Sequence, residues 1–175
     1  MEEKYGLSIK WVQFPLHPET PKEGLSLKDL FVGRDFDIPG IQANLRELMR
    51  FEGLPYGNRT HTFNSRLAQE LSKWGESFSQ SSILNQKIFE AYFVDAQNLA
   101  DQNHLVRLAG KTGLSTQEAF EVLENRSYKE AVDFDWMRSR QIGISGVPTF
   151  VLGQYGISGA QSYEILERFV VENTP

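Results

Sequence analysis

The chain has 175 residues, of which 40% are hydrophobic and 23% are charged, and its formal net charge is −5 at pH 7. These values are ordinary for a globular protein and leave no basic surface that would suit nucleic acid or an anionic membrane. No apolar run is long enough to span a bilayer, and the first residues lack a secretion signal. We therefore expect a cytoplasmic protein with neither nucleic acid nor a membrane as a partner.

The chain contains no cysteine, and its three histidines, His17, His61 and His104, are far apart. The first observation excludes a disulfide framework, a thiol nucleophile and thiolate metal ligands within these residues. The second gives no spacing suited to metal binding, so we expect solvent-facing histidines. The sequence therefore predicts no catalytic residue, no metal site and no bound cofactor.

The first predicted element is a β-strand over residues 7–16. Apolar Leu7, Ile9 and Trp11 alternate with polar residues there, which is typical of a strand that is at least half buried. Three prolines then end the strand and leave an irregular segment to about Gly24.

A helix is predicted next, from Asp37 to Phe51. Asp37 is a suitable N-cap, and Pro39 falls in the first turn, where proline is accepted. The apolar residues of this helix that share one face, and that we expect to pack inward, are Ile41, Leu45, Leu48 and Met49.

Almost all residues from 62 to 145 have helical patterns. Apolar stripes on the first two helices comprise Leu67, Leu71, Trp74 and Phe78, then Ile83, Leu84, Ile88, Tyr92 and Phe93. A third, short helix ends at Gly113, and two capping boxes, each a Ser three residues before a Glu, predict helices that open at Ser115 and Ser127. We expect the charged side chains of these helices to be solvated, and Trp11, Trp74 and Trp136 to lie in or beside the core.

The last part of the chain predicts a hairpin and a final helix. Pro148 opens a β-branched and aromatic run, and its position in a tight loop favours a cis bond after Val147. Strands Thr149–Leu152 and Tyr155–Ser158 are joined by Gly-Gln, which suits a type II′ turn. Ser162 then caps a helix whose inward face is Ile165, Leu166, Phe169 and Val170.

These features resemble the DsbA family of thioredoxin-fold proteins, in particular its FrnE-like branch, which is similar to 2-hydroxychromene-2-carboxylate isomerases and kappa-class glutathione transferases. The matching segments are Asn64-Ser65, Leu84 to Phe93, Gly143 to Phe150, and Tyr155 to Gln161. The resemblance implies an α/β, thioredoxin-like (DsbA-type) sheet in a single domain. Residues 1–24 and 143–175 would form the thioredoxin part, and residues of about 37–142 a large inserted helical block.

The start of the chain departs from this family. Family members begin with a strand, a Cys-x-x-Cys motif and a helix before the strand that is predicted here from Leu7. Such a unit takes about 30 residues or more, whereas only six precede Leu7. We therefore expect the N-terminal βα unit and its redox motif to be missing, through a mis-assigned start, a choice of chain boundaries or a real loss. Because the missing strand would lie in the middle of the sheet, its neighbours would be exposed and would favour a homodimer.

The resemblance places a substrate-binding site at Val147 and Pro148. In the family, the residue before the cis-proline pairs its backbone with an extended peptide or glutathione. Ser158, Gly159, Ala160 and Gln161 would line the same cleft at a helix start. Asn64 and Ser65 match a further family position. Each set also has a purely structural interpretation, because proline fixes loop geometry and Ser or Asn caps helices.

Two functions remain open. The first is a dithiol-disulfide oxidoreductase of the DsbA/FrnE-like family that is redox-inactive in this chain, because the thiolate nucleophile is absent. The second is a non-catalytic thioredoxin-like module that binds a peptide, a glutathione-like thiol or a protein partner, or the remnant of a glutathione-dependent isomerase. A Cys-x-x-Cys motif, or a single Cys or Ser in its place, upstream of Met1 would distinguish them.

Overall fold

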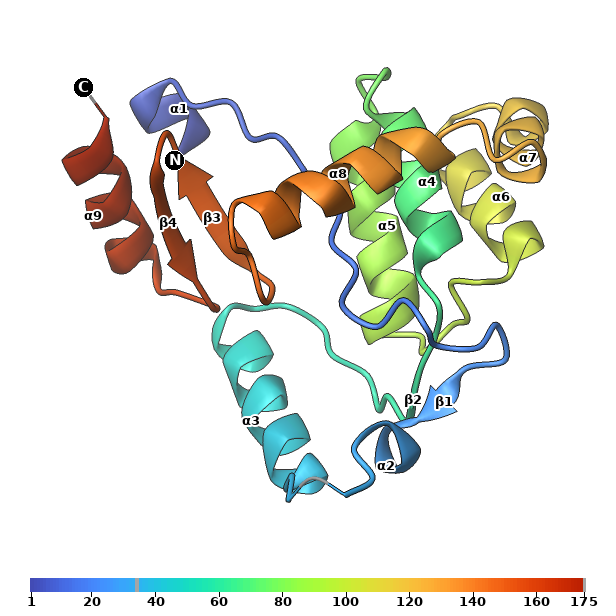
Figure 1. Cartoon of the computed structure of the whole chain (residues 1–175), viewed down its shortest axis with the longest axis horizontal. Helices are drawn as coiled ribbons and strands as arrows, with labels where there is room; N and C mark the ends of the chain where they lie inside the picture. Colours follow the sequence, from blue (N-terminus) through green and yellow to red (C-terminus); the bar gives the residue numbers. More distant parts are fainter. Residues whose placement is uncertain (34, 175) are drawn as a thin grey trace. The chain divides into compact units, whose positions relative to one another are not determined.

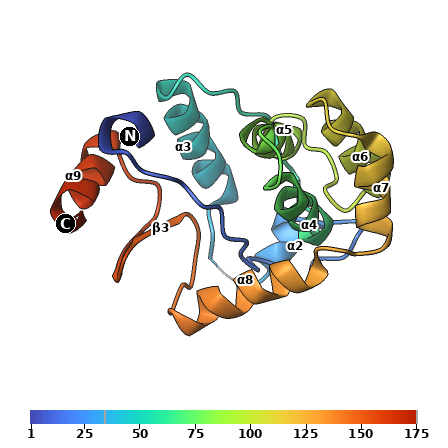
Figure 2. The same cartoon turned by 90° about the horizontal axis from the view of Figure 1, so that it is seen from above.

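The computed structural model describes residues 1–33 and 35–174, and its elements form two compact units. The helical unit is His17–Val132, and the terminal unit is Met1–Leu16 together with Asp133–Pro175. Figures 1 and 2 show the elements of both units from two directions. The helical unit begins and ends earlier than the inserted block of about 37–142 that the sequence suggests.

The core of the helical unit lies among four helices, namely α4 (Arg66–Gly75), α5 (Ser81–Phe93), α6 (Gln102–Lys111) and α7 (Thr116–Glu124). Helix α4 contacts each of the other three, and the four cluster together in both views (Figures 1 and 2). Leu71, Leu84 and Leu105 are fully buried, and Trp74 is 5% exposed. Because apolar residues recur every three or four positions, each helix presents one apolar stripe to this core. The predicted stripes therefore position the core correctly, except at Ile83, which is 51% exposed.

Three predicted N-caps are confirmed. Asp37, Ser115 and Ser162 each accept a hydrogen bond from the backbone N–H three residues later, at 3.0, 3.2 and 3.4 Å. These bonds satisfy N–H groups of the first helical turn that have no partner within the helix. Side-chain capping was therefore a reliable sequence signal for where these helices begin.

The fourth predicted cap, Ser127, is wrong. Helix α8 (Lys129–Gln141) begins two residues later, and the first carbonyl to accept a helical bond is that of Tyr128, from the N–H of Val132. The Ser127 N–H instead donates to the Val122 carbonyl and closes the end of α7. Ser127 therefore ends one helix instead of opening the next, because the turn between the two helices is one residue longer than the capping box implies.

The rest of the helical unit comprises β1 (Leu25–Ser26), α2 (Leu27–Leu30), α3 (Ile38–Phe51) and β2 (His61–Thr62). Strand β1 pairs antiparallel with β2, neither of which the sequence predicts. The predicted helix over α3 is confirmed, but its apolar face is not inward: Ile41 is 44% exposed and Leu48 is 49% exposed. The face stays open because none of the described elements packs broadly against α3.

The terminal unit contains α1 (Glu2–Tyr5), most of α8, the strands β3 (Thr149–Leu152) and β4 (Tyr155–Ser158), and α9 (Tyr163–Asn173). The two strands form an antiparallel hairpin with the predicted bounds, and Phe150 lies opposite Ile157. Gly153 has a φ of 61°, whereas Gln154 has no positive φ, which agrees with a type II′ turn. On α9, Val170 is buried but Ile165 is 42% exposed, so the predicted inward face is only partly correct.

Residues 7–16 join no ladder among the described strands, so the predicted β-strand is wrong. Ile9 is 60% exposed, and Trp11, at 45% exposed, is not part of the buried core. The Gln13 N–H donates to Asp135 Oδ2 on α8 at 3.0 Å. Alternation of side chains predicts an extended chain, but a strand also requires a neighbour that accepts its backbone hydrogen bonds.

We expect Leu105→Ala to lower the free energy of unfolding by about 2–5 kcal/mol, because it opens a cavity in the core of the helical unit. Leu48→Ala is the matched control, because the same atoms are removed from a half-exposed position on α3, at a cost within about 0.5 kcal/mol. Urea unfolding followed by circular dichroism measures both. Equal effects of the two substitutions would contradict this position of the core.

Candidate functional site

The predicted binding loop connects α8 to β3 in the terminal unit. The peptide bond between Val147 and Pro148 is cis. Thr149 Oγ1 donates to the Gly146 carbonyl at 2.7 Å, which closes the loop around these two residues. Val147 is 49% exposed, and its backbone N–H has no backbone partner among the described residues. The loop thus holds a half-exposed residue whose backbone N–H has no backbone partner among the described residues.

The hairpin brings the second predicted segment beside this loop. The Gly159 N–H donates to the Pro148 carbonyl at 2.8 Å, and the hydroxyls of Thr149 and Ser158 lie 3.0 Å apart. Gln161 Nε2 donates to the Ser158 carbonyl at 2.7 Å. The structure therefore places Ser158 and Gly159 next to Pro148. Ala160 and Gln161 follow in an irregular segment.

One expectation for this segment is wrong. Residues 158–161 do not form a helix start, because α9 begins only at Tyr163, with Ser162 as its N-cap. The Ser162 hydroxyl already accepts from the Ile165 N–H. The segment therefore contributes its own loop atoms to the site, and not the N–H groups of a first helical turn.

The hydrogen-bond ladder between β3 and β4 defines which backbone groups of β3 have no partner within the hairpin. In an antiparallel pair, alternate residues exchange hydrogen bonds with the partner strand, and the residues between them direct their N–H and C=O groups away. The Pro148 carbonyl accepts from the Gly159 N–H, and hydrogen-bonded pairs recur at every second residue of the ladder. The backbone groups of Phe150 and Leu152 therefore also bond to β4. The backbone groups of Thr149 and Val151 consequently point to the edge of β3 that faces away from β4.

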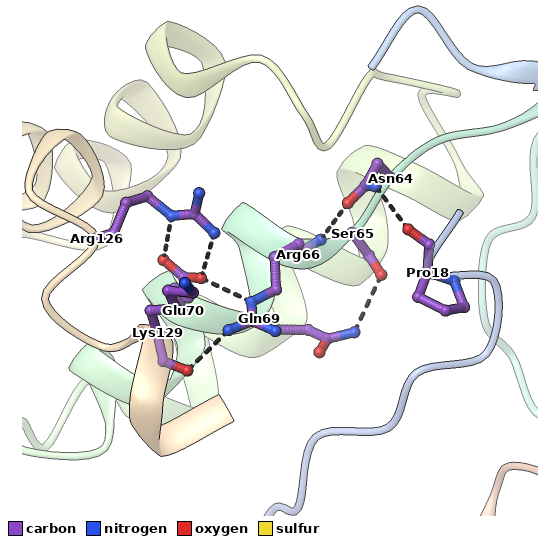
Figure 3. Close-up of polar contacts among 8 residues, drawn as sticks. All are labelled: Pro18, Asn64, Ser65, Arg66, Gln69, Glu70, Arg126 and Lys129. Atoms are coloured by element: carbon purple, nitrogen blue, oxygen red, sulfur yellow. Dashed lines mark hydrogen bonds and ion pairs between the residues drawn. The ribbon is translucent and has the colours of Figure 1, made fainter. Parts of the chain in front are cut away.

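The other two predicted residues lie in the helical unit and have structural partners there (Figure 3). Asn64 Nδ2 donates to the carbonyls of Pro18 and Thr20 at 3.1 and 2.8 Å, while its Oδ1 accepts from the Arg66 N–H at 3.0 Å. Ser65 Oγ accepts from Gln69 Nε2 at 3.1 Å. The Asn64 bonds attach the loop of residues 18–20 to the start of α4, and the N-cap Ser65 makes no side-chain capping bond.

A buried carboxylate in the same region was not predicted. Glu70 on α4 has no exposed surface and lies between two arginines (Figure 3). Arg126 Nε and Nη2 donate to Glu70 at 2.8 and 2.7 Å, and Arg66 Nε donates at 2.7 Å. Burial would raise the pKa of this carboxyl, but the hydrogen bonds from Arg126 and then Arg66 hold the pKa below its ordinary value of 4.5.

The expectation that charged helical residues are solvated is therefore wrong for Glu70. The only sequence signal was its position four residues after Arg66, which places the two side chains on one face of α4. The partner that completes the pairing, Arg126, is 56 residues away and has a φ of 52° in the turn before α8. Arg66 also donates to the Lys129 carbonyl at 2.7 Å, so the cluster joins α4 to the start of α8.

The histidines differ in exposure. His61 is exposed, but His104 is half-buried, and its Nε2 has no hydrogen-bond partner among the described residues. Burial, followed by the charge of Arg107, lowers the pKa of His104. Solvent exposure of all three histidines is thus not observed. No group of histidine and acidic side chains suited to a metal ion occurs in residues 1–33 and 35–174.

The helical unit also contains a shallow pocket of about 310 Å³. Its lining residues are Trp74, Glu118, Glu121, Val122, Asn125, Ser127 and Tyr128. None of the eight predicted site residues lines it. No helix within the described part of the chain is long and apolar enough to cross a membrane.

The chain belongs to the family of DSBA-like thioredoxin domains, because the model of that family matches residues 1–171. A similar solved structure is the probable DsbA oxidoreductase SCO1869 from Streptomyces coelicolor, with a TM-score of 0.80 and 27% identity. That match covers 91% of this chain and 74% of the other. The family and the α/β, thioredoxin-like fold class indicated by the sequence are thereby confirmed.

Two further proteins are similar. The structure of a 2-hydroxychromene-2-carboxylate isomerase matches with a TM-score of 0.78 over 98% of this chain and 83% of the other, and at 19% identity this likeness concerns the fold alone. The uncharacterized protein YwbO from Bacillus subtilis (strain 168) is 28% identical over 143 residues, which is 79% of this chain. The chain spans 61% of the length of YwbO.

We expect Glu70→Gln to lower the free energy of unfolding at pH 7 by about 3–5 kcal/mol, because it leaves two arginine charges without their buried partner. Glu47→Gln is the matched control, because Glu47 is 65% exposed and its pairing with Arg50 contributes at most about 1 kcal/mol. Urea unfolding midpoints at neutral pH compare the two.

The same pair of variants gives a pH test. Because the folded-state pKa of Glu70 lies below 4.5, its ionisation stabilises the fold above about pH 4.5, and this contribution is lost as the pH falls through the folded pKa. The stability gap between wild type and Glu70→Gln should therefore narrow in acid. A gap that stays constant would show that Glu70 does not titrate in this range.

Proposed function

We propose that residues 1–175 form a DsbA-like domain that binds an extended peptide or a glutathione-like thiol and performs no thiol redox chemistry itself. The observation that carries the proposal is Val147 itself, a half-exposed residue beside Pro148 whose backbone N–H has no backbone partner among the described residues, in a chain without cysteine. The membership of the DSBA-like family supports the same position for the ligand.

The contact would be a short strand addition. An extended ligand can accept from the Val147 N–H and donate to its carbonyl, as in other cases of backbone recognition. The neighbouring Pro148 offers no N–H, and its carbonyl already accepts from Gly159. Val147 is therefore the residue of the loop that would provide both a donor and an acceptor to the ligand.

The chemistry of the loop indicates what it would select. No charged residue occurs between Gln141 and Tyr163. Selection would therefore depend on an extended backbone and on apolar contact, with little contribution from ligand charge. Disulfide exchange would require a thiolate to attack a sulfur atom held in this position, and these residues contain no thiol.

A second candidate is thiol-disulfide exchange by a longer polypeptide that contains these residues. The similarity to a probable DsbA oxidoreductase, over 74% of that protein, favours it. In this case the loop at Val147 would hold the substrate, while a thiolate outside residues 1–175 would attack it.

We expect residues 1–175 to leave the rate of insulin reduction by dithiothreitol unchanged, because no thiolate is available to form a mixed disulfide. The measurement is the turbidity of precipitated insulin B chain, with a dithiol-containing thioredoxin as the positive control. A rate above the uncatalysed one, in a preparation free of other thioredoxins, would rule out the inactive domain.

We expect Val147→Pro to weaken glutathione binding about two- to tenfold, since one backbone donor worth roughly 0.5–1.5 kcal/mol is removed. Val147→Ala is the matched control, because it shortens the side chain but keeps the N–H, and it should bind within about twofold of wild type. Titration with reduced glutathione, followed by the amide resonances of residues 146–149, measures the three affinities. Equal affinities of the wild type and the proline variant would exclude this contact.

A further inference from the structure

We propose that the pocket of the helical unit binds a small organic cation that also has an oxygen acceptor, as choline does. The proposal goes beyond ligand binding at Val147 and does not depend on it. It rests on the aromatic side chains that the pocket shares with the core, on two carboxylates without a cation beside them, and on a buried indole N–H that has no partner.

The core of the helical unit forms the apolar part of the pocket. Trp74 on α4 belongs to the buried core cluster, and Val122 and Tyr128 pack against that cluster. Helix α4 contacts α7, which bears Val122. These side chains are therefore held in place before any ligand arrives. The volume of about 310 Å³ lies at the lower end of the range for ligand pockets, about 300–1,000 Å³, so a small molecule suits it.

Two glutamates on α7 make the pocket negative. Glu118 and Glu121 are exposed, and their spacing of three residues places them on one face of the helix. Among the described residues, the Glu118 carboxylate has no partner, and that of Glu121 accepts only from the uncharged Gln117, at 2.7 Å. No Lys, Arg or His lines the pocket, and the nearby Arg126 binds Glu70 instead. A bound cation would relieve the repulsion between these two like charges.

The indole N–H of Trp74 is an independent sign of a ligand. Trp74 is 5% exposed, and its N–H donates to no group in the part of the chain that the structure describes. The nitrogen is not one of the fully covered polar atoms that lack a partner there, so it keeps some accessible surface. Because Trp74 lines the pocket, we infer that this surface faces it. A donor in this position favours a ligand with an oxygen that accepts the bond.

Together these features select one class of ligand. Trp and Tyr rings attract organic cations, quaternary ammonium ions in particular. The two carboxylates add attraction for the same charge and repel an anion. A metal ion would gain nothing from the aromatic walls, whereas the methyl groups of an organic ammonium ion would contact them. A choline-type ligand has the charge, the apolar surface and the hydroxyl oxygen that the pocket can use.

The first experiment titrates choline into isotope-labelled wild type and follows the indole N–H resonances by NMR. The chain has three, from Trp11, Trp74 and Trp136. We expect a saturable shift of the Trp74 resonance at millimolar choline or below, and little change in the other two. The matched ligand is the uncharged carbon isostere of choline, in which a tert-butyl group replaces the trimethylammonium group. It should bind roughly tenfold more weakly, because it lacks the cation.

The second experiment tests the charges of the pocket. Glu118→Gln and Glu121→Gln keep the size of the side chain but remove one charge, and each should weaken choline binding about two- to fivefold. Glu124→Gln is the matched control, because Glu124 is also exposed on α7 but does not line the pocket. It should bind choline within about twofold of wild type, since surface charges away from the site are screened by salt.

The absence of a saturable Trp74 shift up to high millimolar choline would overturn the proposal. Equal affinities of wild type for choline and for its uncharged isostere would also overturn it, and this comparison needs no variant that has to fold. If Glu124→Gln weakened binding as much as the other two substitutions, the carboxylates of the pocket would have no specific part in it, and the proposal would be refuted.

Discussion

A strand is stable only when its backbone N–H and C=O groups have partners, and this requirement governs the terminal unit. One ladder, between β3 and β4, satisfies half of the groups on β3 and fixes Pro148 against Gly159. The groups of Thr149 and Val151 are left in a row on the opposite side. This row lies beside the binding loop that we propose at Val147 and Pro148. Its position follows from the register of a hairpin only four residues long in each strand.

The helical unit has a different source of stability. Its apolar stripes bury Leu71, Leu84 and Leu105 completely, and α4 contributes to this core along its length. The same helix holds Glu70, which is accommodated without water because Arg66 and Arg126 satisfy its charge. A buried carboxylate with two arginine partners has little freedom to move. The cluster thereby attaches the start of α8 to α4, within the unit that has the larger core.

These two units bear on function in different ways. Of the two residues that match a position of the family, Asn64 holds the loop at residues 18–20, and Ser65 accepts from Gln69 within α4. The residues around Pro148, by contrast, keep an open backbone edge in a segment without charge. These contacts support the proposal that residues 1–175 recognise an extended chain. The proposal is compatible with the family and with the lack of cysteine in these residues.

The sequence by itself determined the elements that depend on local patterns. Asp37, Ser115 and Ser162 were recognisable caps, and the Gly-Gln turn set the hairpin register, because these features need only neighbours in the chain. The family was also recognisable from short motifs. Three other features were decided by tertiary structure. Residues 7–16 have the alternation of a strand but join no ladder among the described strands, and no described element packs broadly against the apolar face of α3. Glu70 resembled any solvated helix residue, because the arginine that completes its burial is 56 positions away. Periodicity shows which side of an element is apolar, but only the packing of distant segments decides whether that side is covered.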